Sequence, residues 1–393
     1  MLRRFPERFV KLFVLLLAVT TMTTMACGGT QPEEQAAEVP STSQSAEASP
    51  TTTGDGFDAL EAVYAEVEGL TGDERRAALI ELAMAEGGDL TFYTSTNVDE
   101  SGPITEAFEE ETGIAVNLFR SSAENILQRV LQETDADFAG ADVLNASGRE
   151  MMILDGEGMF APLRTPATEG NAAIYDNWAG IYLNVYVAAW NTDHISPEEA
   201  PKTWDDVWSN YTGDMAFQLD DVEWFATLIT EWYVKEKGMT EDEAVEMFMQ
   251  WAAGNQVVSG HTVGAELLAA GEFSVASSLY QHRMARLKTE NAPIEWEPAV
   301  EPLIIRANGI GIHRDTPKPA TALLFLEYMI TDAQPMLAEF ERTPALRTVE
   351  GGVPEQYDPI RVDLRQVYEE EEKWSALYEE MVRASGDAEI EEE

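Results

Sequence analysis

The sequence predicts an α/β protein, because short apolar segments with strand character alternate with amphipathic helical segments along it. Residues 90–93 and 114–119 have strand character, and the segment between them places Ile104, Ala107 and Phe108 on one helical face. Alternation at this spacing favours a parallel sheet whose strands are connected by crossover helices. The chain of 393 residues is long enough for one large domain or two ordinary ones.

Two helices are expected before the first strand. Residues 57–67 carry apolar side chains at helical spacing, and Thr71 with Glu74 has the spacing of a capping box for a second helix that ends at residues 87–88. The next elements expected are a helix with Ile126, Leu127, Val130 and Leu131, a strand at 142–144, a helix at 150–154 and a long strand at 182–190.

The second half of the sequence repeats this mixture of elements. Thr203 begins one capped helix, and Thr240 with Glu243 begins another. The remaining elements expected are a helical stripe over 224–232, a helix stopped by Gly271, strands at 273–279 and 303–312, a buried helix at 322–330 and a last amphipathic helix from Leu364 to Met381. The Glu-rich end predicts a solvated tail.

The N-terminus has the pattern of an export signal. Basic residues Arg3, Arg4, Arg8 and Lys11 precede a short apolar run at 12–19, which is too short to span a bilayer. Small residues then lead to Cys27, the only cysteine of the chain. This resembles a bacterial lipobox, although Thr24 stands where Leu is usual. We therefore expect a signal peptide at 1–26, acylation of Cys27 and a flexible Ser/Thr/Pro/Glu linker at 28–56.

The charge of the chain is strongly negative, with 72 acidic against 25 basic residues and a formal net charge of −47. A field of this sign repels nucleic acid and anionic lipid headgroups, so neither is an expected partner. Self-repulsion of this size favours a salt-adapted surface, whose charges are screened by ions. An acidic protein of no special habitat is the alternative. With a single cysteine, no internal disulfide is expected.

An ordered set of local matches gives the chain a family resemblance over residues 57–350. The segments are LTFYTSTN, AFEEETGIAVN, FRSSAENILQRVLQE, ADVLNAS, GMFAPL, YVAAWNTD, APKTWDDV, GHTVGAELLAAGEFSVASSLYQHRM, NAPIEW and KPATALLFLEYMITDAQPMLAEF. In this order they resemble a solute-binding protein of an ABC transporter, of the ferric-iron type. Each motif alone is weak evidence, and their order carries the resemblance.

The resemblance implies a two-lobed periplasmic-binding-protein fold of type II, in which crossing strands form a hinge. The first lobe would comprise residues 57–182, the second 183–302, and residues 303–393 would return to the first lobe and end in a C-terminal helix and acidic tail. Such a protein is not an enzyme and has no cofactor. It is expected to be a monomer, to be held at the membrane only by its lipid, in the periplasm or on the outer face of the plasma membrane, and to deliver its ligand to ABC permease subunits.

Polar side chains follow the first three expected strands, where an open α/β sheet binds ligands. The candidate ligand-binding residues are Tyr93, Thr94, Ser95, Thr96, Ser121, Ser122, Asn145, Ser147, Trp224 and Tyr280. The strand exits also suit ordinary polar loops or turns. Ser121 and Glu124 have capping-box spacing, while a helix N-terminus there would attract an anion and Glu124 could ligate a hard metal ion. Trp224 and Tyr182 also suit the core.

Tyr280 is the sharpest candidate. Family members that hold bare ferric iron carry two adjacent tyrosines, whereas this chain has Leu279 before Tyr280. His282 is a possible compensating donor, and the tentative metal ligands are Tyr280, Glu124 and Tyr93. His261 and Arg306 are polar residues in small or apolar surroundings, and Arg306 suits an anionic ligand or, better, a salt bridge.

The ligand is expected to be ferric iron, bare or with a small anion, and Fe(III) would be cargo. A small organic solute such as a phosphonate is the alternative. No Gly-x-Ser-x-Gly, His-Glu-x-x-His or Gly-x-x-x-x-Gly-Lys motif occurs in the sequence. A secreted carbohydrate-active enzyme, using a pair of carboxylates, is therefore a remote alternative.

Overall fold

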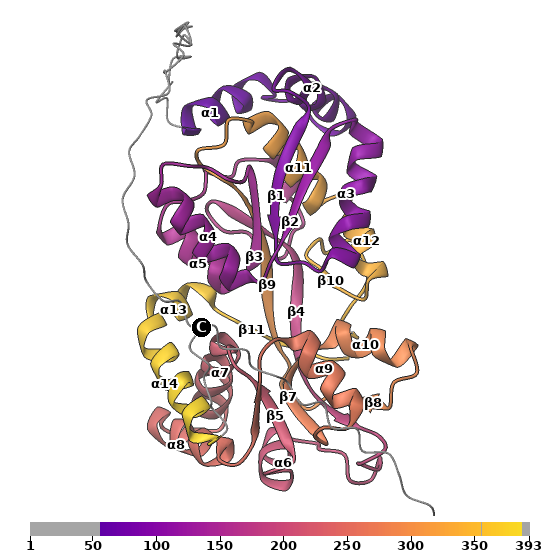
Figure 1. Cartoon of the computed structure of the whole chain (residues 1–393), viewed down its shortest axis with the longest axis vertical. Helices are drawn as coiled ribbons and strands as arrows, with labels where there is room; N and C mark the ends of the chain where they lie inside the picture. Colours follow the sequence, from indigo (N-terminus) through magenta and orange to yellow (C-terminus); the bar gives the residue numbers. More distant parts are fainter. Residues whose placement is uncertain (1–55, 355, 387–393) are drawn as a thin grey trace, which may run out of the picture. The chain divides into compact units, whose positions relative to one another are not determined.

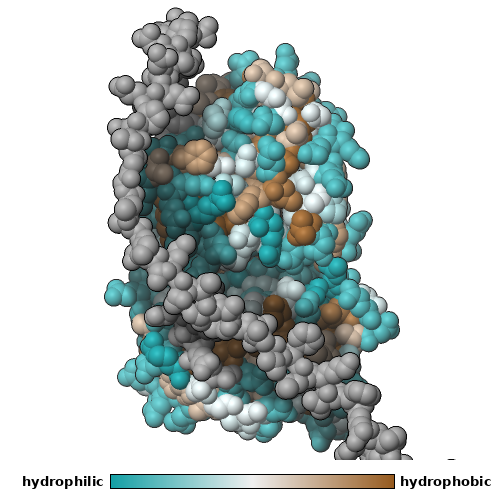
Figure 2. Space-filling view, in the orientation of Figure 1, coloured by the Kyte–Doolittle hydropathy of each residue, from teal (hydrophilic) through white to brown (hydrophobic). Residues whose placement is uncertain are grey.

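The computed structural model describes residues 56–354 and 356–386, which belong to one compact unit. The expected signal peptide, Cys27 and nearly all of the 28–56 linker lie outside the described residues, as does the end of the Glu-rich tail. Within the described ranges, no helix has the length and apolar character needed to cross a membrane. Figure 2 shows hydrophilic residues over much of the visible face of these residues, in keeping with the acidic composition.

The first lobe is built on the parallel strands β1, β2 and β3. β1 lies between the other two, and its register pairs Phe92 with Leu118 on one side and with Val143 on the other. The elements of this part of the chain are α1 (Gly56–Glu66), α2 (Gly72–Ala85), β1 (Asp89–Thr94), α3 (Val98–Thr112), β2 (Ala115–Arg120), α4 (Ala123–Asp135), β3 (Val143–Ser147), α5 (Gly148–Gly156) and the short helix η1 (Pro166–Thr168). These follow the expected order of strands and helices.

Two long antiparallel strands run through both lobes at the centre of the molecule (Figure 1). They are β4 (Trp178–Asn191), which is buried at every position, and β9 (Ile304–Ile312). β9 also pairs antiparallel with β3, and β4 pairs antiparallel with β7, so that Tyr186 stands opposite Tyr280. The sheet is therefore mixed: parallel pairs within each half are joined through an antiparallel centre.

The second lobe surrounds the parallel pairs β5–β6 and β5–β7. Its elements are α6 (Trp204–Asn210), β5 (Met215–Gln218), α7 (Val222–Thr227), the π-helix η2 (Leu228–Glu236), α8 (Glu241–Ala252), β6 (Gln256–Val258), α9 (His261–Ala270), β7 (Val275–Tyr280), α10 (Gln281–Thr289) and β8 (Ile294–Glu295). α9 ends, as expected, at Gly271, whose φ of +81° suits glycine.

The chain then returns to the first lobe and finally crosses back. The remaining elements are α11 (Pro319–Ile330), α12 (Gln334–Glu339), the two-residue strands β10 (Thr343–Pro344) and β11 (Ile360–Arg361), α13 (Leu364–Glu369) and α14 (Glu371–Ala384). α11 packs on α1 and α2, but α14 packs on α7 and α8 of the second lobe. Trp374 and Tyr378 face Phe225 with ring centroids 6.1 and 5.4 Å apart. From the sequence we expected residues 303–393 to belong to the first lobe and to end in a single helix. Both expectations are wrong: the last helix is divided into α13 and α14, and α14 packs on the second lobe.

The capping predictions have mixed outcomes. The boxes at Thr203 and Thr240 are formed, with reciprocal bonds to Asp206 and Glu243. Thr71 precedes α2 but its side chain accepts no capping bond. The cap of α4 is Ser122, which accepts from the N–H of Asn125 at 3.2 Å, so the spacing of Ser121 and Glu124 does not make a capping box.

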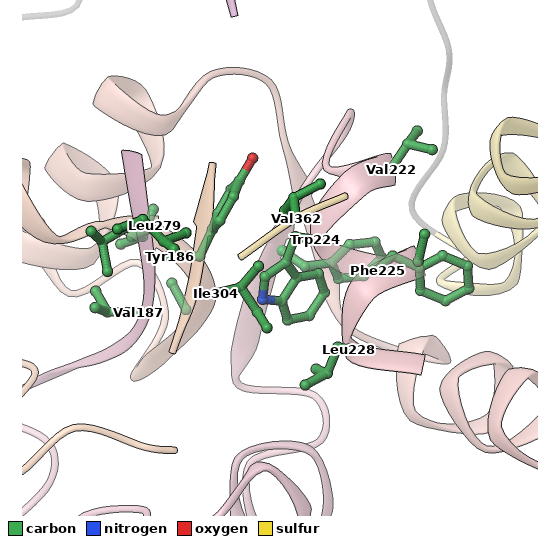
Figure 3. Close-up of a cluster of buried hydrophobic side chains, with 14 of the residues drawn as sticks. Tyr186, Val187, Val222, Trp224, Phe225, Leu228, Leu279, Ile304 and Val362 are labelled. Atoms are coloured by element: carbon green, nitrogen blue, oxygen red, sulfur yellow. The ribbon is translucent and has the colours of Figure 1, made fainter. Parts of the chain in front are cut away.

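Two apolar clusters hold the fold together. One lies in the first lobe, between α1, α2, α3 and α11. The other runs from Ile126 on α4 to Trp224 on α7 and so includes residues of both lobes. Figure 3 shows Trp224 within the second cluster, beside Phe225 and Leu228. Trp224 is completely buried and contacts Trp204 edge-on, so this candidate ligand residue is part of the core.

Candidate functional site

Four of the predicted site residues meet at the ends of β1 and β3. Thr94 and Thr96 both donate to Oδ1 of Asn145, at 2.6 and 3.0 Å. Asn145 in turn donates to Oδ1 of Asn308 on β9 at 2.5 Å, and Asn308 donates to the hydroxyl of Ser95 at 3.4 Å. The strand-end rule thus located a real polar cluster, but most of its hydrogen-bonding capacity is used within the protein.

Tyr93 turns away from this cluster. Its hydroxyl donates to Glu133 and accepts from Arg129, both at 3.0 Å, and its ring lies 4.9 Å from that of Phe119. Burial is the main reason why the pKa of Tyr93 is raised. In the described part of the chain Tyr93 makes no hydrogen bond to Tyr280, and Glu124 is exposed on the first turn of α4. The three tentative metal ligands are therefore not assembled into one centre here.

The three predicted serines have separate surroundings. Ser121 is partly buried at the exit of β2, where its N–H donates to the carbonyl of Thr94 at 3.2 Å. Ser122 caps α4. Ser147, at the end of β3, donates to the buried carboxylate of Glu150. Burial, reinforced by the nearby charge of Glu223, raises the pKa of Glu150.

The centre of the candidate site is a cluster formed by Tyr186, Tyr280, Arg306 and Glu223, which we call the Arg306 cluster. Three adjacent strands, β4, β7 and β9, deliver the first three residues. Arg306 donates from Nη2 to the hydroxyl of Tyr280 and from Nε to that of Tyr186, both at 2.5 Å. Its Nε also lies 2.7 Å from the Glu223 carboxylate. The salt-bridge reading of Arg306 is thus confirmed, with two phenols added to it.

Opposing electrostatic effects act on the pKa of each of the two phenols. Burial raises the pKa of both Tyr186 and Tyr280, and the positive charge of Arg306 acts against this rise without cancelling it. The carboxylate of Glu223 adds to the rise. Both tyrosines are consequently neutral in the ligand-free protein near neutral pH.

Of the adjacent positions 279 and 280, only Tyr280 contributes a side chain to the Arg306 cluster. Successive side chains of a strand point to opposite faces, and Leu279 is completely buried in the apolar cluster of Figure 3, opposite Val187. The second phenol beside Tyr280 comes instead from Tyr186, whose ring centroid is 5.3 Å away across the sheet. Sequence reasoning missed Tyr186, because a tyrosine in a uniformly apolar strand looks like a core residue.

Two histidines border Tyr280. The imidazole of His261, the first residue of α9, stacks on the ring of Tyr280 with centroids 3.6 Å apart, and its Nε2 lies 3.1 Å from Asp221. His282 is 5.6 Å from Tyr280 and its Nδ1 lies 3.4 Å from Arg342. Burial and the charge of Arg342 hold the pKa of His282 well below its usual value, so it is neutral. Both histidines therefore lie at this site, and a neutral imidazole is the metal-binding form.

Ion pairs and polar contacts connect the two lobes. Arg149 on α5 lies 3.3 Å from Asp220 after β5, and Asp99 on α3 pairs with Arg286 on α10. Arg342 pairs with Glu100 at 2.8 Å while touching His282 of the second lobe. These contacts join residues of the two lobes directly, and they leave the Arg306 cluster largely buried between them.

Two cavities lie away from the Arg306 cluster. One, of about 540 Å³, is lined by residues of the second lobe that include His194, Tyr211 and Asp214. Another, of about 420 Å³, lies around Arg75 and Glu327 in the first lobe. Among the described residues, no group of three or more His, Cys, Asp or Glu side chains is placed to hold a metal ion. A metal at the Arg306 cluster would therefore need phenol oxygens.

Comparison with known proteins gives a consistent result. Residues 104–350 match the family model of bacterial extracellular solute-binding proteins. Iron uptake protein A1 of Synechocystis sp. is 21% identical over 276 residues, which cover 64% of this chain and 74% of that protein.

Solved structures with 18% sequence identity share the fold. Iron-bound HitA from Pseudomonas aeruginosa has a TM-score of 0.64, with 75% of this chain and 99% of that chain covered. AfuA from Actinobacillus pleuropneumoniae, with fructose-6-phosphate bound, has a TM-score of 0.66, with coverage of 76% and 99%. The Trichodesmium protein IdiA (FutA), in complex with iron and citrate, has a TM-score of 0.59, with coverage of 76% and 99%. These likenesses confirm the two-lobed α/β fold of the type II periplasmic binding proteins.

Proposed function

Because this chain belongs to the family of bacterial extracellular solute-binding proteins, we propose that it is the receptor of an ABC importer and that its cargo is a ferric ion, alone or with a small anion. The cargo would be held at the Arg306 cluster and handed to the permease subunits without chemical change. The fold is that of binding proteins.

The convergence of two phenols on one guanidinium carries this proposal. Tyr186 and Tyr280 place their oxygens on the same Arg306 side chain at 2.5 Å each. Phenolates are hard oxygen donors, and ferric iron is a hard cation, so the pair supplies two suitable ligands. Hydrogen bonds from a guanidinium favour the ionised form of each phenol. His261, stacked on Tyr280, adds an imidazole beside them.

An accompanying anion also has a partner in this cluster. Nη1 of Arg306 is buried and has no hydrogen-bond partner among the described residues. A guanidinium edge of this kind suits a carboxylate or carbonate oxygen of an iron-bound anion. The relatives named above include one that holds iron and one that holds iron with citrate, which supports the choice of ferric citrate as the first probe.

The test is a titration of the full-length protein with ferric citrate, followed by visible absorbance. We expect a tyrosinate-to-iron charge-transfer band that saturates near one equivalent, with release of protons as the phenols ionise. Citrate without iron is the control and should give no band. A folded protein that shows no band with ferric citrate would contradict the ferric proposal.

A small organic anion is the second candidate. Leu279 leaves Tyr280 without an adjacent phenol on its own strand, and Nη1 of Arg306 offers an unpaired cationic edge. A phosphonate or a sugar phosphate would use that edge without needing phenolates. Stabilisation of the protein against heat by such a compound, in the absence of any ferric band, would select this candidate.

The N-terminal pattern supports an anchored location. We expect cleavage before Cys27 and acylation of its thiol, so that residues 28–56 tether a monomeric receptor to an extracytoplasmic membrane surface. Replacing Cys27 by Ala should release the protein from the membrane fraction. Retention of the variant in that fraction would exclude the lipid as the anchor.

A further inference from the structure

Several buried polar side-chain atoms in and beside the second lobe have no hydrogen-bond partner among the described residues. Among the described residues, the atoms without a hydrogen-bond partner include both carboxylate oxygens of Asp221, Oε1 of Gln218, Nδ1 of His261 and Nη1 of Arg306. Asp221 is 0% exposed and Gln218 is 3% exposed. Buried polar groups are nearly always hydrogen-bonded, and a local group of exceptions calls for a ligand or ordered water.

The side chain of Asp221 does not cap the helix that it precedes. It occupies the N-cap position of α7, where an Asp side chain ordinarily accepts a bond from the first turn, yet it makes no such bond. Its carboxylate instead points to His261, whose Nε2 is 3.1 Å from Oδ1. Since His261 stacks on Tyr280, the carboxylate borders the Arg306 cluster. Its charge is also among the causes, after burial, that raise the pKa of Tyr280.

The charges around the cluster are unbalanced. The carboxylates of Glu150, Asp221 and Glu223 are buried here, and the more exposed carboxylate of Asp220 lies near all three. Against them stand Arg306, which pairs with Glu223, and Arg149, which is shared with Glu371 at 2.5 Å. An excess of buried negative charge is costly unless a cation compensates it. Among the described residues, Asp221 has no guanidinium or ammonium partner, and only the imidazole of His261 lies within ion-pair distance of it.

We propose that Asp221 is a cargo-binding residue: its buried carboxylate, next to His261 and Tyr280, accepts the positive charge of the cargo, with Gln218 as a neutral acceptor beside it. This rests on the proposed function and deepens it, since it assigns the cationic part of the cargo, the ferric centre, to the second-lobe side of the Arg306 cluster. It also predicts that the anion alone is a poor ligand. Asp221 is then retained for binding at the expense of the stability of the empty protein.

The test compares Asp221→Asn with Asp142→Asn in the full-length protein. Asp142 is a matched control, because it is also buried but its oxygens accept from the N–H of Thr91 at 2.8 Å and the hydroxyl of Thr316 at 2.6 Å. We expect D221N to raise the melting temperature of the ligand-free protein and D142N to lower it. We also expect D221N to weaken ferric citrate binding about tenfold or more, the loss of a charge-assisted contact.

The outcomes separate this proposal from the ferric one. If D221N lowers the ligand-free melting temperature as D142N does, Asp221 is structural and the proposal is overturned, whatever the cargo is. Unchanged ferric affinity in D221N also overturns it. If the wild-type protein binds no ferric citrate, the ferric proposal fails by itself. In that case a higher melting temperature for D221N still supports Asp221 as a residue kept for binding a cation.

Discussion

The imidazole of His261 lies almost flat against the ring of Tyr280, with centroids 3.6 Å apart and planes inclined by 24°. The first residue of α9 therefore supports one face of the ring, while Arg306 holds the hydroxyl from the side. A phenol fixed at both its ring and its oxygen loses little conformational freedom when it binds cargo.

Tyr280→Phe should strongly weaken the ferric charge-transfer band, because it removes one of the two phenol oxygens while leaving the stacked ring in place. Tyr93→Phe is the matched control. Its hydroxyl is bound to Glu133 and Arg129, so the band should persist in this variant. Visible titration of both variants with ferric citrate decides the matter. An intact band in Y280F would remove Tyr280 from the ligands.

Tyr186→Phe should weaken the same band and lower ferric affinity about tenfold or more, as expected when a ligand of a charged centre is lost. The physical reason is that Tyr186 provides the second phenol that Leu279 cannot provide. Tyr182→Phe serves as control, since the Tyr182 hydroxyl lies 3.1 Å from Thr96 at the other polar cluster. Equal behaviour of Y186F and Y182F in the titration would contradict a role for Tyr186.

Arg306→Met should destabilise the protein by about 3–5 kcal/mol, because it leaves the buried Glu223 carboxylate without its partner. The double variant with Glu223→Leu should recover much of this loss, since both charges are then removed together. Arg383→Met is the control, because it removes an ion pair whose side chains are exposed: those of Arg383 and Glu379 are 58% and 69% exposed. We expect its free energy of unfolding to change by less than about 1 kcal/mol. Urea unfolding of the three variants measures these changes. A small loss of stability in R306M would contradict the role given to the Arg306–Glu223 pair.

The stability of the protein should fall as the pH rises from about 4 to about 7. Partial desolvation, together with the charges of Glu150, Glu223 and Asp221, raises the pKa of Asp220 from 3.8 to about 7. The native state then holds a proton that the unfolded state has released, and this advantage disappears as the pH passes the native pKa. Because the side chain is 47% exposed, the effect will be modest. Asp220→Asn should flatten urea-derived stability across this range, whereas Asp176→Asn, at a 79% exposed position, should not.

The melting temperature should rise with NaCl concentration. A formal net charge of −47 makes self-repulsion a large destabilising term, and ions screen it. Calorimetric scans from low to molar salt measure the effect. A flat or falling curve would show that the acidic surface is not adapted to salt.

Sequence patterns were informative where one segment carries the signal. Strand ends located Thr94, Thr96 and Asn145, and a local motif located Tyr280. They were uninformative where the site depends on pairs brought together by folding. Arg306 and Glu223 are far apart in the chain, and nothing in either segment indicates its partner.

Two further residues show how a local pattern can point the wrong way. The Asp-Asp-Val-Glu segment at 220–223 has the pattern of an ordinary helix start, and nothing in it indicates that the Asp221 side chain turns to His261 instead of capping α7. Tyr93 looked equivalent to the other strand-end residues, but the strand directs it to α4, where Arg129 and Glu133 hold its hydroxyl. In both cases the direction of the side chain and partners distant in the sequence determine what the residue contacts.

β4 is buried along all of its 14 residues and pairs with β9 and β10 in its first part and with β7 and β8 towards its end. Its first half lies among strands of one lobe and its second half among strands of the other. Neither lobe is therefore a module that could be exchanged between relatives, since a cut would expose unpaired strand edges on both sides. The two lobes are therefore continuous through β4, and a change in their relative orientation would bend this strand.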